Sequence, residues 1–167
     1  MALKADRHEL DVDISYFYNA GTAERGGVVS HTGTSVGGSG AAMDQANALV
    51  SYKQGAADVI PVGVLLNDVV NLDLTRQHIN WHKDEVQKGG KVSILKKGYV
   101  VTDMVTGTVN ELGEAACLDD GGATGKFEPC DASSTDVVVG RFMSLADEDG
   151  YYKVEVNLPA PTTQADT

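Results

Sequence analysis

Two histidines four residues apart, His78 and His82, have the spacing in this sequence that most suggests metal chemistry. On a helix they would share one face, as paired zinc ligands do. The zinc-protease pattern also requires a glutamate directly after the first histidine, and Ile79 stands there. We therefore expect a solvated polar segment, anchored to the core by Trp81, rather than a metal site.

Three other segments contain the residue types of ligand sites without the spacing that such sites need. The acidic runs 119–120 and 147–149 could offer oxygens to Ca²⁺, but neither has the ligand spacing of an EF-hand loop. We expect both to be acidic, solvated turns. The glycine-rich run 37–40 lacks the lysine of a phosphate-binding loop, so we interpret it as a linker. The sequence thus predicts no metal, no cofactor and no catalytic cluster, and we expect a protein that is not an enzyme.

The two cysteines of the chain are Cys117 and Cys130. Two cysteines are too few for a disulfide framework, and their separation fits no common metal-binding pattern. We expect two reduced, half-buried thiols. The alternative is a disulfide that closes the loop between them.

The charge balance narrows the classes of partner. Among 167 residues there are 13 Lys and Arg against 24 Asp and Glu, which gives a formal net charge of −11. Such an acidic chain is poorly suited to binding nucleic acid or an anionic membrane surface. Residues 1–15 lack the apolar core of a signal peptide, and no apolar run is long enough to span a bilayer. We therefore expect a protein that is made in a cytoplasm and stays soluble.

The short, valine-rich apolar runs and the abundance of glycine are typical of strands joined by turns. We predict an all-β fold, a small β-barrel or β-sandwich, with its core domain over 41–158 and a flexible tail over 159–167. Gly98 is expected to mark a bend or bulge, and 119–125 a hairpin turn. Residues 75–87 are interpreted as a loop with one helical turn. The predicted strands are 48–52, 59–66, 69–74, 91–102, 107–118, 127–130, 137–145 and 151–158.

A loose internal repeat connects two parts of this predicted core. Residues 61–66 and 89–94 resemble 138–143 and 149–154, since each pair has a Val-Gly strand and then a Lys-Val strand. The repeat indicates a barrel or sandwich that is built from two related β units.

The clearest strand pattern lies near the N-terminus, in residues 9–18, ahead of a glycine-rich segment. Apolar and polar residues alternate there, so one face of the strand is apolar. We interpret residues 1–40 as an extended arm and linker. The strand either adds to a sheet edge of a partner protein or pairs within its own domain. The candidate interaction residues are Leu10, Val12, Ile14, Tyr16, Phe17 and Tyr18.

Four segments between residues 59 and 158 have a sequence pattern that is similar to that of a known class of protein. They are VIPVGVLLNDV (59–69), GGKVSILKKGYVVTD (89–103), GTVNELGEAACLDDGG (107–122) and VGRFMSLADEDGYYKVEV (139–156). This sequence pattern resembles that of the capsid decoration, or cement, proteins of tailed bacteriophages. The segments are strand-and-turn phrases and contain no catalytic signature.

The resemblance implies a virion structural protein on the capsid surface. Its partner would be the major capsid protein, it would stabilise contacts between capsomers, and it would self-associate as a homotrimer. Many such proteins have an N-terminal arm that becomes ordered on the shell, and residues 1–40 match that arrangement. One alternative is another virion β module, a head fibre base or a tail-associated protein. A small β-barrel enzyme or ligand-binding protein is a further alternative, and it would need a deep pocket.

Overall fold

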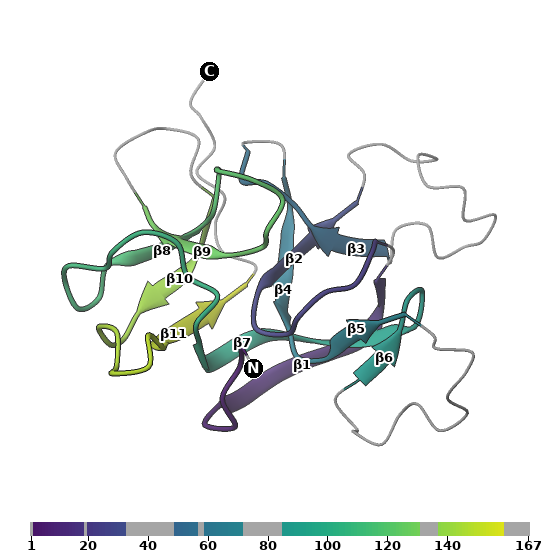
Figure 1. The fold of residues 1–167 in the computed structure, drawn as a ribbon, viewed down its shortest axis with the longest axis horizontal. Helices are drawn as coiled ribbons and strands as arrows, with labels where there is room; N and C mark the ends of the chain where they lie inside the picture. The colour runs from purple at the N-terminus through teal and green to yellow at the C-terminus, as the bar shows by residue number, and fades with distance from the viewer. Residues whose placement is uncertain are drawn as a thin grey trace.

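The computed structural model describes residues 2–18, 20–32, 49–56, 59–71, 85–130 and 137–158. Within these ranges the chain forms strands and turns without a helix, which confirms the predicted all-β class (Figure 1). The strands are β1 (His8–Tyr18), β2 (Val28–His31), β3 (Leu49–Tyr52), β4 (Pro61–Leu65), β5 (Asp68–Val70), β6 (Glu85–Gln87), β7 (Lys91–Thr102), β8 (Ala115–Leu118), β9 (Phe127–Pro129), β10 (Val138–Phe142) and β11 (Tyr152–Asn157).

Five of these strands form a ring, which we call the first ring. The strand order is β1–β3–β2–β4–β7, and β7 pairs again with β1. The β1–β3 pair is parallel and the other pairs are antiparallel. Closing a sheet in this way covers strand edges that would otherwise be open. The buried apolar cluster of this ring contains Tyr18, Ala23, Val29, Val50, Val62, Leu65, Val69, Val92 and Ile94.

The sheet continues from β7 into a second half with the order β7–β11–β10–β8–β9. The chain after β7 then returns to β9, because Thr106 N–H donates to the Phe127 carbonyl at 2.7 Å and Phe127 N–H to that of Met104 at 2.9 Å. The second buried cluster contains Leu3, Val28, Val64, Leu66, Leu95, Val100, Val109, Ala116, Leu118, Phe127, Val137, Val139, Phe142, Val154, Val156 and Leu158.

The two clusters share strands. In β2, Val28 belongs to the second cluster and Val29 to the first; in β4, Val64 and Leu65 divide in the same way. Successive side chains of a strand point to opposite faces, so one short apolar run can serve two cores. This explains why β2 and β4 read as continuous apolar segments rather than as alternating ones.

The described N-terminal residues, 2–18 and 20–32, belong to the folded core, where we expected an extended arm; residues 33–40 of that arm lie outside the described residues. β1 pairs with β7 from His8 opposite Tyr99 to Phe17 opposite Lys91. Ahead of β1, the pairing resumes where Leu3 bridges to Thr102, and the Leu3 side chain is buried. Of the two alternatives for residues 9–18, the structure thus shows pairing within the chain. The period of two predicts a strand but does not identify its partner.

Gly98 lies at the irregularity that the sequence predicts in β7. Its φ is 141°, and a Cβ atom there would lie 2.0 Å from the His8 carbonyl oxygen. The register of the facing strand shifts between Glu9 and Asp11, beside this glycine. The β1 backbone can approach this closely only because position 98 has no side chain.

The two halves of the predicted repeat form corresponding strand pairs. β4 pairs antiparallel with β7, and β10 pairs antiparallel with β11. The glycine of each Val-Gly strand faces a partner backbone: a Cβ would lie 2.4 Å from the Leu95 oxygen at Gly63, and 1.9 Å from the Glu155 oxygen at Gly140. The Val-Gly phrase therefore marks a close approach of two strands in both places. Residues 40–44 resemble 114–119, which lie in the corresponding place upstream of the second pair, but residues 40–44 are outside the described residues.

Two predicted elements differ from the structure. The strand expected over 107–118 is limited to β8, because Gly107 and Gly113 adopt φ values of 80° and 85° and place turns before it. Residues 85–87 form β6, which pairs in parallel with β5, where a loop with one helical turn was expected. The rest of that segment, with His78 and His82, lies outside the described residues, as does the 37–40 run.

Candidate interaction surface

The six candidate interaction residues divide into two groups along β1. Leu10, Val12 and Ile14 are exposed, with relative accessibilities of 71%, 37% and 62%. We call these three residues the apolar row. Three large apolar side chains at alternate positions of one strand have no role in the buried core. An exposed apolar group of this kind is a candidate site for contact with another molecule.

The aromatic end of β1 packs within the chain. Tyr18 is 2% exposed and its ring meets that of Tyr52 edge to face, with centroids 5.9 Å apart. Burial raises the pKa of Tyr18 above its ordinary value. Tyr16 meets the ring of His31 at 5.7 Å. Tyr16 and Phe17 are half-buried, so this end of β1 packs against its own domain while the apolar row is exposed.

Charged contacts hold the middle of β1 against β7. Lys96 Nζ lies 2.6 Å from Asp13 Oδ2, and the Ser15 N–H donates to Asp13 Oδ1 at 2.8 Å. The hydrogen bond from Lys96, followed by that from Ser15, lowers the pKa of Asp13 to about 2. The apolar row therefore lies on a strand that is paired with β7 and is held there by the Lys96–Asp13 contact.

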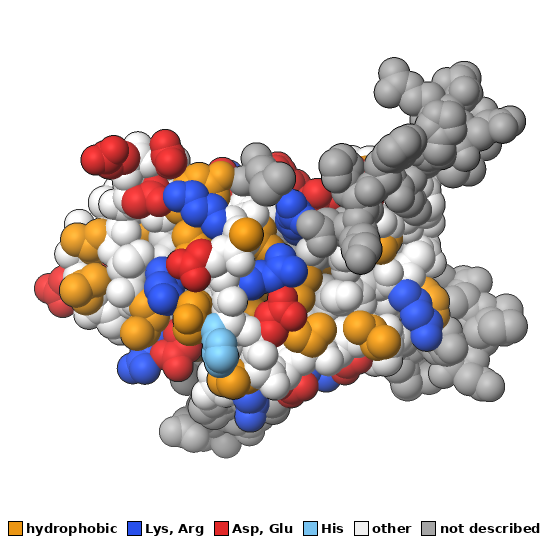
Figure 2. Space-filling model, turned by 90° about the horizontal axis from the view of Figure 1, so that it is seen from below, with side chains coloured by type: hydrophobic (Ala, Val, Ile, Leu, Met, Phe, Trp, Pro, Cys, Tyr) orange, Lys and Arg blue, Asp and Glu red, His pale blue; other side chains and the backbone are white. Residues whose placement is uncertain are grey.

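β1 does not offer a regular strand edge. Its register against β7 shifts between Glu9 and Asp11, between Asp11 and Val12, and again between Asp13 and Tyr16. Bulges and charges along an edge hinder the addition of a further strand. Figure 2 shows the face that lies below in Figure 1, where hydrophobic side chains are interspersed with acidic and basic ones. Side chains, rather than backbone pairing, are thus the available means of contact.

Four large apolar residues outside β1 are also exposed, and sequence reasoning did not single them out. Ile60 is 54% and Leu112 69% exposed, and Met143 and Leu145 reach 45% and 46%. The Gly113 N–H donates to the Phe142 carbonyl at 2.8 Å, which brings Leu112 toward the β10 end. Single exposed apolar residues are common, so these positions serve best as comparison sites for the apolar row.

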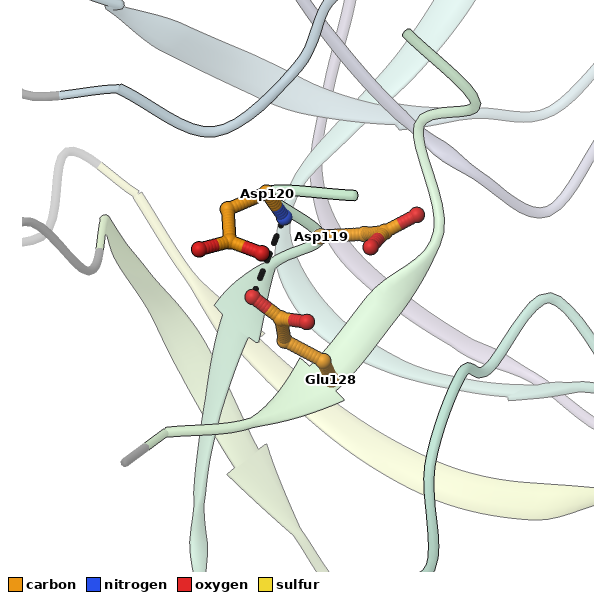
Figure 3. A group of neighbouring side chains, drawn as sticks. All are labelled: Asp119, Asp120 and Glu128. Atoms are coloured by element: carbon orange, nitrogen blue, oxygen red, sulfur yellow. Dashed lines mark hydrogen bonds between the residues drawn. The ribbon is translucent and has the colours of Figure 1, made fainter. Parts of the chain in front are cut away.

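An acidic group lies at the β8–β9 hairpin (Figure 3). Oxygens of Asp119, Asp120 and Glu128 lie within 4.8 Å of one another. The turn itself uses these carboxylates: Asp119 accepts from the Gly121 N–H at 2.9 Å, and Glu128 from the Asp120 N–H at 3.1 Å. The expected acidic turn over 119–125 is confirmed, with Asp119 buried at 4% rather than solvated. Glu128 joins the group only through strand pairing, which sequence spacing does not reveal.

The acidic run 147–149 forms the connection between β10 and β11. Asp147 Oδ1 accepts from the Tyr151 N–H at 2.8 Å, and Asp147 Oδ2 lies 2.6 Å from Lys4 Nζ. The hydrogen bond with Asp147 raises the pKa of Lys4, and the same bond lowers the pKa of Asp147. Asp147 thus shapes the turn and ties it to the N-terminal segment.

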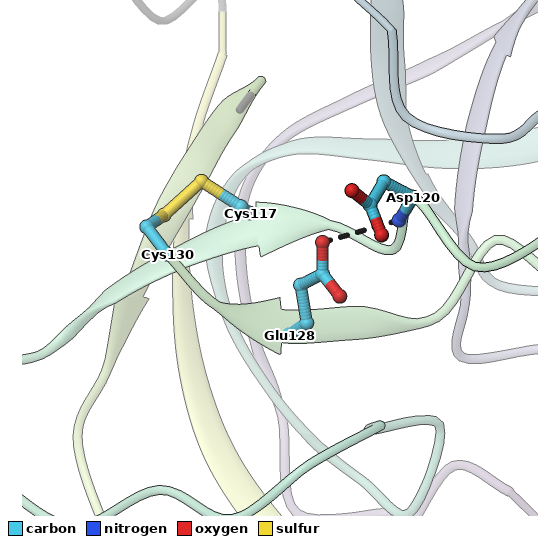
Figure 4. Close-up of a disulfide and its surroundings, with 4 residues drawn as sticks. All are labelled: Cys117, Asp120, Glu128 and Cys130. Atoms are coloured by element: carbon cyan, nitrogen blue, oxygen red, sulfur yellow. Dashed lines mark hydrogen bonds between the residues drawn. A yellow bond between two sulfur atoms is a disulfide. The ribbon is translucent and has the colours of Figure 1, made fainter. Parts of the chain in front are cut away.

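The expectation of two reduced thiols is wrong, because Cys117 and Cys130 form a disulfide (Figure 4). Their Cα atoms lie 5.2 Å apart. Cys117 stands opposite Glu128 in the β8–β9 pair, and Cys130 N–H donates to the Ala115 carbonyl at 3.1 Å. Hairpin pairing therefore brings the two cysteines within bonding distance. Their separation in sequence does not determine that register.

A shallow, open hollow lies beside β5. Ligand sites are usually concave and mostly apolar, whereas this hollow is open and acidic. Its lining consists of Thr22, Ala23, Glu24, Asp68, Val70 and Glu85.

No protein-family model and no curated protein sequence matches the chain. Among the described residues, no helix is long and apolar enough to cross a membrane.

Proposed function

We propose that this chain is a non-enzymatic virion structural protein, a capsid decoration protein of a tailed bacteriophage. It binds the outer face of the head and stabilises contacts between capsomers. The observation that carries the proposal is the apolar row, Leu10, Val12 and Ile14, exposed on a strand that is fixed in its own domain. A rigid apolar row suits docking onto a preformed surface, because little conformational entropy is lost on binding.

Two further features support this function. The segments that resemble decoration proteins contain all or most of β4, β7, β8, β10 and β11, which all belong to the nine-stranded sheet. The net charge of −11 favours particles that repel one another and disfavours the packaged nucleic acid as a partner.

Binding through several linked copies at once should raise the overall affinity for a shell above that of a single copy. A homotrimer that engages three neighbouring capsid sites binds far more tightly than one protomer does, without any new type of contact. Sedimentation equilibrium of the purified protein should give a mass of three chains. A monomer at all concentrations would contradict the homotrimer.

Binding to shells tests the function directly. Empty shells of the cognate major capsid protein are sedimented with wild-type protein and with the double variant Leu10→Ser/Ile14→Ser. We expect saturable binding by the wild type. The variant should bind roughly 10- to 100-fold more weakly, because partial burial of each of the two side chains at the interface contributes about 0.7–1.4 kcal/mol, roughly half the value for full burial.

The matched control is Ile60→Ser/Leu112→Ser, which also removes two exposed apolar side chains. It should bind as the wild type does. Deletion of residues 1–40 is not a useful test, because it removes β1 and β2 from the first ring. Absence of wild-type binding to shells overturns the decoration function, and binding to purified tails instead would indicate a tail-associated module.

A further inference from the structure

The loop between β8 and β9 connects the two halves of the molecule. It belongs to the second half, yet its carbonyl groups accept hydrogen bonds from the first. The Gly55 N–H donates to the Asp119 carbonyl at 2.8 Å, and the Val28 N–H donates to the Gly125 carbonyl at 2.6 Å. Val28 belongs to β2, and Gly55 follows β3. A movement of this loop would therefore break contacts with the first ring.

The loop is also closely packed against the ring. A Cβ atom at Gly55 would lie 2.3 Å from the Leu118 oxygen, and one at Gly125 would lie 2.2 Å from the Tyr52 ring. The side chain of Gln54 donates to the Asp120 carbonyl. The β8–β9 hairpin and the ring are thus in close contact, without room for a side chain at Gly55 or Gly125.

The hairpin ladder that positions this loop is short. It consists of three residue pairs, from Ala116 opposite Pro129 to Leu118 opposite Phe127. The disulfide joins Cys117, in the middle pair of the ladder, to Cys130, which follows β9 at the end away from the loop. A covalent bond there keeps the ladder from opening at its free end.

We propose that the Cys117–Cys130 bond is a redox latch that forms after the chain has folded and that fixes the second half against the first ring. The hairpin does not need the bond to assemble, since Leu118 and Phe127 are held in the second apolar cluster. A reducing cytoplasm keeps both cysteines as thiols, whereas an oxidising environment outside the cell allows the disulfide to form and persist. The latch acts whatever partner the protein has, so it is independent of the proposed function.

The two sulfur atoms differ in access. Cys117 is 0% exposed, while Cys130 is half-buried. With a small disulfide such as oxidised glutathione, the Cys130 thiolate attacks one glutathione sulfur and releases the other glutathione as its thiolate. The Cys117 thiolate then attacks the Cys130 sulfur and displaces the second glutathione. Two protein thiols and one small disulfide thus become one protein disulfide and two small thiols.

The test compares reduced and oxidised wild-type protein with Cys130→Ser. We expect the reduced protein to keep the far-UV circular dichroism of the oxidised form. Oxidation should raise the Tm by roughly 6–12 °C, as a loop of this length implies for a chain of this size. Cys130→Ser should match the reduced wild type and not respond to oxidised glutathione. Iodoacetamide should alkylate Cys130 before Cys117 in the folded, reduced protein.

Amide hydrogen exchange distinguishes a disulfide that stabilises the contacts between the two halves from one that stabilises only the β8–β9 hairpin. Exchange at the Val28 and Gly55 amides should be at least about tenfold slower in the oxidised protein. Equal exchange at both amides in the two redox states would overturn the latch, and so would a reduced protein that does not fold. Exchange that slows only within β8 and β9 would likewise limit the bond to the hairpin and overturn the proposal.

Discussion

Asp13 contributes to stability through its contacts with Lys96 and Ser15. Its pKa in the folded chain is about 2, against 3.8 for an unperturbed aspartate. Because the folded pKa is the lower of the two, the contribution is complete above pH 4 and is lost as the pH falls toward 2. Asp13→Asn should therefore cost about 1 kcal/mol near neutral pH, an amount reduced by partial solvent screening.

Urea denaturation between pH 2 and pH 6 measures this contribution. The difference in unfolding free energy between wild type and Asp13→Asn should shrink as the pH approaches 2. Glu148→Gln, at an exposed position of the β10–β11 turn, is the control and should change stability by less than about 0.5 kcal/mol. A difference for Asp13→Asn that is constant over the whole pH range would contradict the argument.

Gly140 is a position at which one added carbon atom should lower the stability of the fold. A Cβ there would lie 1.9 Å from the Glu155 carbonyl oxygen, which is backbone of β11 and cannot rotate away. Gly140→Ala should thus lower the free energy of unfolding by about 1–3 kcal/mol, measured from the denaturation midpoint. Gly21→Ala is the control, because nothing lies within 4 Å of its added methyl group. Equal midpoints for the two variants would show that β10 and β11 can separate without cost.

At the scale of elements, the N-terminal segment combines a structural part and an exposed part. Leu3 is 1% exposed and belongs to the second cluster, whereas Leu10 is 71% exposed on β1. Leu3→Ala should cost about 2–5 kcal/mol, and the identical change at Leu10 should stay within about 0.5 kcal/mol. Thermal denaturation of both variants measures the contrast. Similar losses of unfolding free energy in both variants, or no loss in either, would contradict the view that the segment is buried at Leu3 and exposed at Leu10.

At the scale of the whole molecule, the shared strands couple the two apolar clusters. Because β2 and β4 contribute to both clusters, neither half can lose its core while the other remains intact. We expect one cooperative unfolding transition, with equal calorimetric and van't Hoff enthalpies. Phe142→Ala in the second cluster and Ile94→Ala in the first should both shift this single transition, each by about 2–5 kcal/mol. Two transitions, each shifted by only one variant, would show independent halves.

The sequence by itself determined the fold class and most strands. Alternation in 9–18, β-branched runs such as 59–66 and 151–158, and the Asp-Gly turn after residue 118 are local signals that depend on backbone sterics and side-chain period. The sequence also predicted a bend or bulge at Gly98 and a repeat of the Val-Gly pair, whereas the close approach of two strands at Gly63 and Gly140 was evident only in the structure. Predictions from local signals of this kind do not depend on which strand lies next to the segment in the sheet.

Only the tertiary structure decided which strands meet. The pairing of β1 with β7, the register that brings Cys117 to Cys130, and the approach of Glu128 to the acidic turn all join residues across separate strands. The exposed row also required the fold, because the period of two defines an apolar face without showing whether another element covers it. Contacts between strands depend on register and on competition among all possible partners, and a one-dimensional pattern does not contain that information.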